Sequence, residues 1–210
     1  MTFELRWARY DGGMFARIVT SENVAAALGL INVALLVRRS IWNYLFGALS
    51  VALYGYVFYS SQLYSDAILQ IYFFLMQFYG AWNWLYGRNA DGLARIETLS
   101  ARERLGFLAA VVVVGAALGW TFRTTTNAAA PFMDATLAAM SVVAQYLLSV
   151  RKLENWLLWI AADVVYIGLY GWKHLYSTSV LYAVFLVLSI AGLLEWLREY
   201  KTHAVAPVPA

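Results

Sequence analysis

One apolar stretch in the C-terminal third of the chain carries the side chains best suited to bind a ligand. Asp163 is the acidic residue that lies deepest in such a stretch, and Trp159 and Trp156 precede it by four and seven residues. This spacing places the carboxylate and both indoles on one face of a helix, flanked by Asn155 and Tyr166. Indole faces attract cations, and a carboxylate balances a positive charge or accepts hydrogen bonds from hydroxyl groups.

A second polar and aromatic cluster lies earlier in the chain. Its members are Gln77, Tyr79, Trp82, Asn83 and Trp84. Single amide side chains also interrupt other apolar stretches, at Asn32, Asn43 and Gln145. A carboxamide group pairs with both the donor and the acceptor of a ligand amide. Rings, amides and one carboxylate together favour a flat, polar ligand with a positive charge.

Each of these side chains also has an explanation that needs no ligand. Asp163 could join two helices through a hydrogen bond, and Asn43 and Asn155 could hold neighbouring helices together. Tryptophans near the ends of apolar stretches are typical of the belts at membrane surfaces. Those that fit a belt are Trp42, Trp84, Trp120, Trp172 and Trp196.

The composition requires a membrane to surround these residues. Of the 210 residues, 62% are apolar or aromatic and only 13% are charged. In soluble domains roughly 45–50% of residues are apolar and about 25% are charged. The chain has no cysteine, its two histidines lie at a loop and in the tail, and it has no glycine-rich phosphate loop. We therefore expect a multi-pass membrane protein with no metal site, no cofactor and no nucleic-acid partner.

Seven stretches approach the roughly 20 apolar residues that cross a bilayer as a helix. The sequence thus predicts an all-α polytopic membrane protein with seven transmembrane helices. Their approximate bounds are 20–37, 41–60, 64–87, 104–121, 131–150, 153–172 and 176–197.

The first three spans are repeated in the last three after a shift of 112 residues. Because one further span separates the copies, both cross the membrane in the same direction. We expect a 3+1+3 arrangement of parallel three-helix repeats related by an axis along the membrane normal. Parallel repeats of this kind occur in transporters, with the substrate site at the repeat interface. The most informative matches are Arg39/Arg151, Asn43/Asn155, Tyr54/Tyr166, Gly80/Gly192 and Trp84/Trp196.

These patterns divide the chain into five parts. Residues 1–18 have the pattern of an amphipathic surface segment, 19–87 form the first repeat, 88–130 form a linker with the fourth span, 131–198 form the second repeat, and 199–210 read as a disordered tail. Ten of the 15 Lys and Arg residues fall on the side that holds the C-terminus. This bias predicts an N-terminus outside and a C-terminus in the cytoplasm.

Two motifs resemble those of the PnuC nicotinamide riboside transporters. The pattern Trp-x-x-Trp-x-x-x-Asp spans 156–163, and Gln-x-Tyr-Gly-x-x-x-Trp spans 77–84. The likeness covers roughly 20–198 and implies the 3+1+3 core of that family, which is similar to that of SWEET sugar transporters. It also implies uptake of nicotinamide riboside across the bacterial inner membrane by facilitated diffusion with alternating access. A cytoplasmic kinase would then trap the nucleoside by phosphorylation.

Carried onto this chain, the resemblance and the residue patterns suggest eight substrate-binding residues. They are Trp159, Asp163, Asn155, Gln77, Trp156, Asn43, Tyr79 and Tyr166. Thiamine, riboflavin or a sugar remain alternative substrates. A membrane-embedded enzyme or a receptor-like subunit is the alternative outside transport. An enzyme needs several converging acid, base or metal groups, and the deep titratable group is Asp163 alone, so we predict a carrier. Whether it forms a homo-oligomer in the lipid stays open.

Overall fold

The computed structural model describes residues 12–60, 64–86, 95–125, 130–172 and 176–205. These residues form seven α-helices, and the all-α polytopic fold is confirmed. The helices are α2 (Gly12–Val37), α3 (Asn43–Ser60), α4 (Tyr64–Tyr86), α5 (Ala101–Thr125), α6 (Pro131–Ser149), α7 (Asn155–Trp172) and α8 (Tyr176–Val205).

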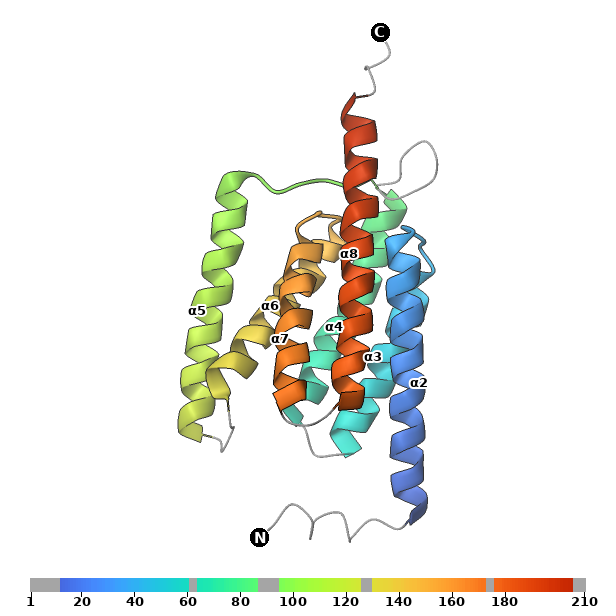
Figure 1. Ribbon diagram of the computed structural model, residues 1–210, viewed down its shortest axis with the longest axis vertical. Coiled ribbons are helices and arrows are strands. Elements are labelled where there is room, and N and C mark those ends of the chain that lie inside the picture. The colour runs from blue at the N-terminus through green and yellow to red at the C-terminus, as the bar shows by residue number, and fades with distance from the viewer. Residues whose placement is uncertain (1–11, 61–63, 87–94, 126–129, 173–175, 206–210) are drawn as a thin grey trace.

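The helices pack as two groups of three with a separate helix at one side (Figure 1). In the first group α3 packs on α2 and α4, and in the second α7 packs on α6 and α8. Among the described elements, α5 contacts α6 alone. Gly115 and Gly119 of α5 face Thr136 and Phe132 of α6. Because glycine has no side chain, the two helices can approach closely at these positions.

The contacts between the two groups follow a two-fold pattern. α2 packs on α8, and α6 packs on α4. The shift of 112 residues converts α2 into α6 and α4 into α8, so each of these contacts is the image of the other. In both groups the first and third helices run in the same direction (Figure 1). The geometry is that of parallel repeats.

Both repeats make the same turn after their first helix. Arg39 and Arg151 occupy this turn with φ angles of 54° and 60°, a left-handed conformation that non-glycine residues adopt rarely. The backbone N–H of Arg39 donates to the carbonyl of Leu36 at 2.9 Å, and that of Arg151 donates to the carbonyl of Leu148 at 3.0 Å. The same strained turn therefore occurs in both copies.

The predicted binding residues Asn43 and Asn155 belong to these turns. Nδ2 of Asn43 donates to the carbonyl of Ser40 at 2.6 Å, and Nδ2 of Asn155 donates to the carbonyl of Lys152 at 2.7 Å. Each asparagine is fully buried at the first position of its helix. Their repeated role is to fix the start of α3 and α7.

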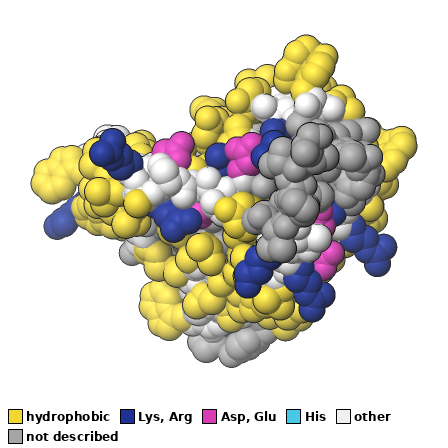
Figure 2. All heavy atoms as spheres, turned by 90° about the horizontal axis from the view of Figure 1, so that it is seen from above, with side chains coloured by type: hydrophobic (Ala, Val, Ile, Leu, Met, Phe, Trp, Pro, Cys, Tyr) yellow, Lys and Arg dark blue, Asp and Glu magenta, His cyan; other side chains and the backbone are white. Residues whose placement is uncertain are grey.

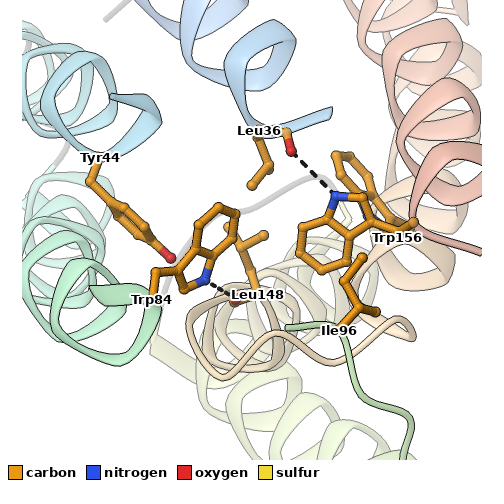
Figure 3. Close-up of a cluster of buried hydrophobic side chains, with 7 residues drawn as sticks. Leu36, Tyr44, Trp84, Ile96, Leu148 and Trp156 are labelled. Carbon is orange, nitrogen blue, oxygen red and sulfur yellow. Dashed lines mark hydrogen bonds between the residues drawn. The ribbon is translucent and has the colours of Figure 1, made fainter. Parts of the chain in front are cut away.

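Buried aromatic and aliphatic side chains form a cluster at one end of the bundle, here called the tryptophan end (Figure 3). The cluster consists of Leu36, Tyr44, Trp84, Ile96, Leu148, Trp156 and Trp196. Nε1 of Trp84 in the first repeat donates to the carbonyl of Leu148 in the second at 3.3 Å. Nε1 of Trp196 in the second repeat donates to the carbonyl of Leu36 in the first, also at 3.3 Å. Both indoles are buried, at 1% and 0% exposure. The expectation of a surface belt is wrong for these two rings, because each N–H bonds across the repeat boundary.

Two glycines let the cluster pack. Gly80 faces the ring of Tyr44, and Gly192 faces the ring of Trp156. Positions 80 and 192 are repeat mates, as are 44 and 156. A side chain at either glycine would overlap an aromatic ring, so glycine is required here for space within the helix pair.

The last helix extends beyond the predicted end of the second repeat. α8 continues to Val205, so residues 199–205 are helical where composition predicted a disordered tail. Glu199 forms an ion pair with Arg39 at 2.9 Å, and Thr98 donates to the hydroxyl of Tyr200 at 3.4 Å. These contacts stabilise the added turns. The amphipathic segment predicted at 1–18 lies mostly outside the described residues, and α2 begins at Gly12.

Charged side chains surround the tryptophan end. Lys and Arg are spread around this face, with Asp and Glu between them (Figure 2). Four of the described helices are long and apolar enough to cross a membrane by length and composition. They cover Thr20–Val37, Ala101–Thr125, Pro131–Ser149 and Ser179–Thr202.

Candidate ligand-binding cavity

A cavity of about 580 Å³ lies between the two repeats, a volume typical of small-molecule sites. Leu36, Leu148 and Trp156 line it where it meets the tryptophan end. In the other direction its lining reaches Glu22 and Asn23, which are exposed on the first half of α2. The cavity is therefore closed by the aromatic cluster and extends toward the end of the bundle where α2 begins.

The second repeat provides a ring and a carboxylate to the cavity. Trp159 and Asp163 of α7 both line it. Asp163 is 5% exposed, and its Oδ2 accepts a hydrogen bond at 3.0 Å from Oγ of Ser189 on α8. This bond orients the carboxylate and leaves its other oxygen for a ligand. The predicted face with Trp156 also reaches the cavity.

Amide side chains line the cavity from both repeats. Gln77 of α4 is 5% exposed, and Gln145 of α6 is 6% exposed. Nε2 of Gln145 has no hydrogen-bond partner in the part of the chain that the structure describes. A buried N–H donor without a partner is costly, so a ligand acceptor at this position would remove the penalty.

The cavity wall has acidic side chains and no basic ones among the described residues. Glu22 and Asp163 are its acidic residues, and none of the described residues that line it is Arg, Lys or His. A wall with acidic and no basic side chains stabilises an anion poorly, whereas a cation gains from both the carboxylates and the aromatic faces.

Four of the eight predicted binding residues line the cavity and four do not. Those that line it are Trp159, Asp163, Gln77 and Trp156. Asn43 and Asn155 lie in the turns instead. Tyr79 is 41% exposed and stacks on Tyr146 at 6.4 Å, outside the cavity lining. The ring of Tyr166 stacks on that of Tyr182 with 4.5 Å between the ring centroids. Of these two residues, Tyr182 lines the cavity.

Several polar residues of the lining were not among the predicted binding residues. Asn32 and Gln145 interrupt apolar spans, which is a visible signal, but amides in spans also join helices without any ligand. Ser189 has no such signal, because serine is common in membrane helices. Ser50 is buried and donates to the carbonyl of Ala25 at 2.8 Å, so its hydroxyl holds α3 against α2. Further polar lining residues are Glu22, Asn23 and Gln70.

Comparison with known proteins agrees with this architecture. A family described as nicotinamide mononucleotide transporter matches residues 20–198. The chain belongs to this family. It is therefore a multi-pass membrane transporter and not an enzyme.

Relatives with known names support the same assignment. The chain is 31% identical over 194 residues to the nicotinamide riboside transporter PnuC of Neisseria mucosa, covering 87% of this chain and 73% of that protein. It is 28% identical over 183 residues to the riboflavin/roseoflavin transporter RibM of Streptomyces davaonensis, covering 85% of each. A crystal structure of the vitamin B3 transporter PnuC superposes with a TM-score of 0.73 at 28% identity, covering 90% of this chain and 86% of the other.

Proposed function

We propose that this chain carries nicotinamide riboside across the bacterial inner membrane by facilitated diffusion. The observation that carries the proposal is the cavity wall, where Trp159, Asp163 and the amides of Gln77 and Gln145 meet. The names of the relatives support the same substrate. Trp156 completes the set of residues that we place at the site.

The ligand and the wall have matching chemistry. Nicotinamide riboside has a flat cationic pyridinium ring, a carboxamide and a ribose. The indole of Trp159 offers a face for the cation, a contact worth about 0.5–2 kcal/mol. Glutamine amides pair with the carboxamide. Asp163 balances the charge and accepts hydrogen bonds from ribose hydroxyls.

The wall favours a nucleoside over the corresponding nucleotide. A phosphate monoester carries a charge of about −1.5 to −2 at neutral pH. Binding it would require Arg, Lys or a similar donor, and the described lining supplies none while adding Glu22 and Asp163. We therefore favour the substrate named for the relatives over the mononucleotide in the family description.

Transport would proceed by alternating access of the two repeats. The cavity is closed at the tryptophan end by the rings of Trp84 and Trp196, whose N–H groups bond to the opposite repeat. Release at that end requires the repeats to separate and both bonds to break. If the basic tryptophan end is cytoplasmic, the cavity lies toward the outside, and phosphorylation by a kinase would trap the released nucleoside.

A binding and flux experiment tests this function. Purified protein in liposomes should take up labelled nicotinamide riboside down its gradient without an imposed ion gradient. Tryptophan fluorescence should change on titration with this nucleoside and not with its mononucleotide. No response to nicotinamide riboside would overturn the proposal.

Riboflavin is the second candidate, because one relative is named for it. Riboflavin is neutral, so it gains neither charge balance from Glu22 and Asp163 nor a cation–π contact from Trp159. Competition between the two vitamins in the same titration separates the candidates. If nicotinamide riboside displaces bound riboflavin only at large excess, riboflavin becomes the first candidate.

A further inference from the structure

Gly47 of α3 lies directly against the side-chain amide of Gln77 on α4. A methyl group at Gly47 would lie 2.6 Å from Oε1, 3.0 Å from Cδ and 3.2 Å from Nε2 of this glutamine. Gly47 is buried, so the amide rests on the backbone of α3 in space that any side chain would occupy. The position of the Gln77 amide in the cavity wall thus depends on the glycine.

The repeat mates of this pair carry different residues. Position 47 corresponds to Trp159, and position 77 corresponds to Ser189. In the second repeat an indole stands at the position of Gly47, and a serine stands at the position of Gln77. The same two positions therefore present an amide on one side of the cavity and an aromatic ring on the other.

Gly47 differs from the glycines of the tryptophan end. Gly80 and Gly192 face rigid rings that belong to the packed cluster. Gly47 faces the far end of a flexible side chain, which can rotate away at small cost. A larger residue at 47 should therefore move the amide of Gln77 without unfolding the protein.

We propose that Gly47 is a specificity-determining position that holds the Gln77 amide where it recognises the carboxamide of the ligand. This inference rests on the proposed function. An amide offers an N–H donor and a carbonyl acceptor, so it can form two hydrogen bonds with a carboxamide. A carboxylate accepts but does not donate, so one of its oxygens would face the oxygen of Gln77.

The test compares nicotinamide riboside with its analogue in which a carboxylate replaces the carboxamide. The purified full-length wild type should bind the carboxamide more tightly. Gly47→Ala should reduce the ratio of the two affinities by about tenfold, the loss expected when a buried hydrogen bond of about 1–2 kcal/mol is broken. The melting temperature should stay near that of the wild type.

Two further variants separate specificity from packing. Gly168→Ala adds the same methyl group where no atom lies within 4 Å, and it should leave the ratio unchanged. Gly47→Ala combined with Gln77→Asn shortens the amide by one methylene and gives the new methyl group room. This double variant should recover part of the lost ratio.

Three results would overturn the inference. An unchanged ratio in Gly47→Ala would show that the contact does not set specificity. Equal loss of both ligands with a lower melting temperature would show a packing role only. If the wild type responds to nicotinamide riboside neither in the liposome flux assay nor in the fluorescence titration, the proposed function and this inference are both overturned. If the wild type binds and either of the first two results is found, the inference alone is overturned.

Discussion

The two repeats are alike at the tryptophan end and different in the cavity. At the tryptophan end Arg39 and Arg151 share the left-handed turn, and Trp84 and Trp196 make equivalent bonds across the boundary. These contacts join the repeats to each other. Each contact occurs twice because the same interface is made by both copies.

In the cavity the polar residues and Trp159 have repeat mates of other types, although apolar mates such as Phe73 and Phe185 both line it. Val51 corresponds to Asp163, and Gly47 corresponds to Trp159. A ligand with one charged ring and one amide has no two-fold symmetry, so a symmetric wall could satisfy only half of its groups. The comparison indicates that the framework needs equal repeats while ligand recognition needs unequal ones.

The loop before α5 adds a second asymmetry. The backbone N–H of Glu97 donates to the carbonyl of Arg151 at 3.0 Å, and its carboxylate accepts from Nζ of Lys152 at 2.9 Å. Glu154 also accepts from the backbone N–H of Leu99 at 3.0 Å. The turn of the second repeat is thereby held by the linker. The first repeat has Ser40 at the position of Lys152.

The largest expected effect comes from substituting the two equivalent glycines that let the tryptophan end pack in both repeats. Gly192→Ala and Gly80→Ala should each lower the free energy of unfolding by up to about 3 kcal/mol, because the added methyl overlaps Trp156 or Tyr44 in a packed cluster. Thermal unfolding in detergent measures the loss. If either variant melts like the wild type, the cluster is not packed as described.

The crossed bonds provide the next test. Trp84→Phe and Trp196→Phe each remove an N–H donor and part of a buried ring, with an expected cost of about 2 kcal/mol. The two variants should lose equal stability in the same unfolding assay, because their bonds are equivalent. A loss confined to one variant would contradict the two-fold pattern.

Substituting a cavity residue that differs between the repeats should have a smaller effect, and this effect is on ligand binding. Trp159→Ala should weaken binding of nicotinamide riboside by about 1.5 kcal/mol, roughly tenfold, through loss of stacking and cation–π contact. Titration calorimetry measures it. Trp120→Ala is the matched control, because Trp120 is 63% exposed on α5. Equal effects of the two substitutions would remove Trp159 from the site.

The smallest effect concerns the linker contact. The hydrogen bond from Lys152 holds the pKa of Glu97 below its ordinary value of 4.5. The resulting stability is present above that ordinary value and is lost as the pH falls through the lowered pKa. Lys152→Met should cost less than about 1 kcal/mol at pH 7, because the pair is partly exposed.

A pH series of melting temperatures checks this last expectation. The difference between Lys152→Met and the wild type should shrink below pH 4.5. Arg38→Met is the control from the turn of the first repeat, where Arg38 is exposed. A difference that does not change with pH would assign the effect to the lysine stem and not to its charge.

Much of the fold could be predicted because membrane helices follow from length and hydropathy. Apolar stretches of nearly 20 residues specify spans without reference to their neighbours. The matches Arg39/Arg151 and Gly80/Gly192 specified the repeat, since each copy must make the same turn and the same close contact.

The candidate site was less predictable. Trp159 and Asp163 share a helix face, and this spacing can be read from one segment. Asn43 and Asn155 have the same residue type as a binding amide, yet their side chains bond to the turn carbonyls three residues earlier. The sequence did not reveal this difference, because the direction of a side chain depends on the local backbone.

The sequence alone determined that the chain crosses a membrane as two parallel triplets of helices, because hydropathy and self-similarity are properties of the chain itself. The tertiary structure decided which polar groups face the cavity and which rings close it. Trp84 and Trp196 could have joined a surface belt, and Gln145 could have joined two helices. Their roles follow from contacts between helices far apart in the chain, such as α4 with α6 and α2 with α8.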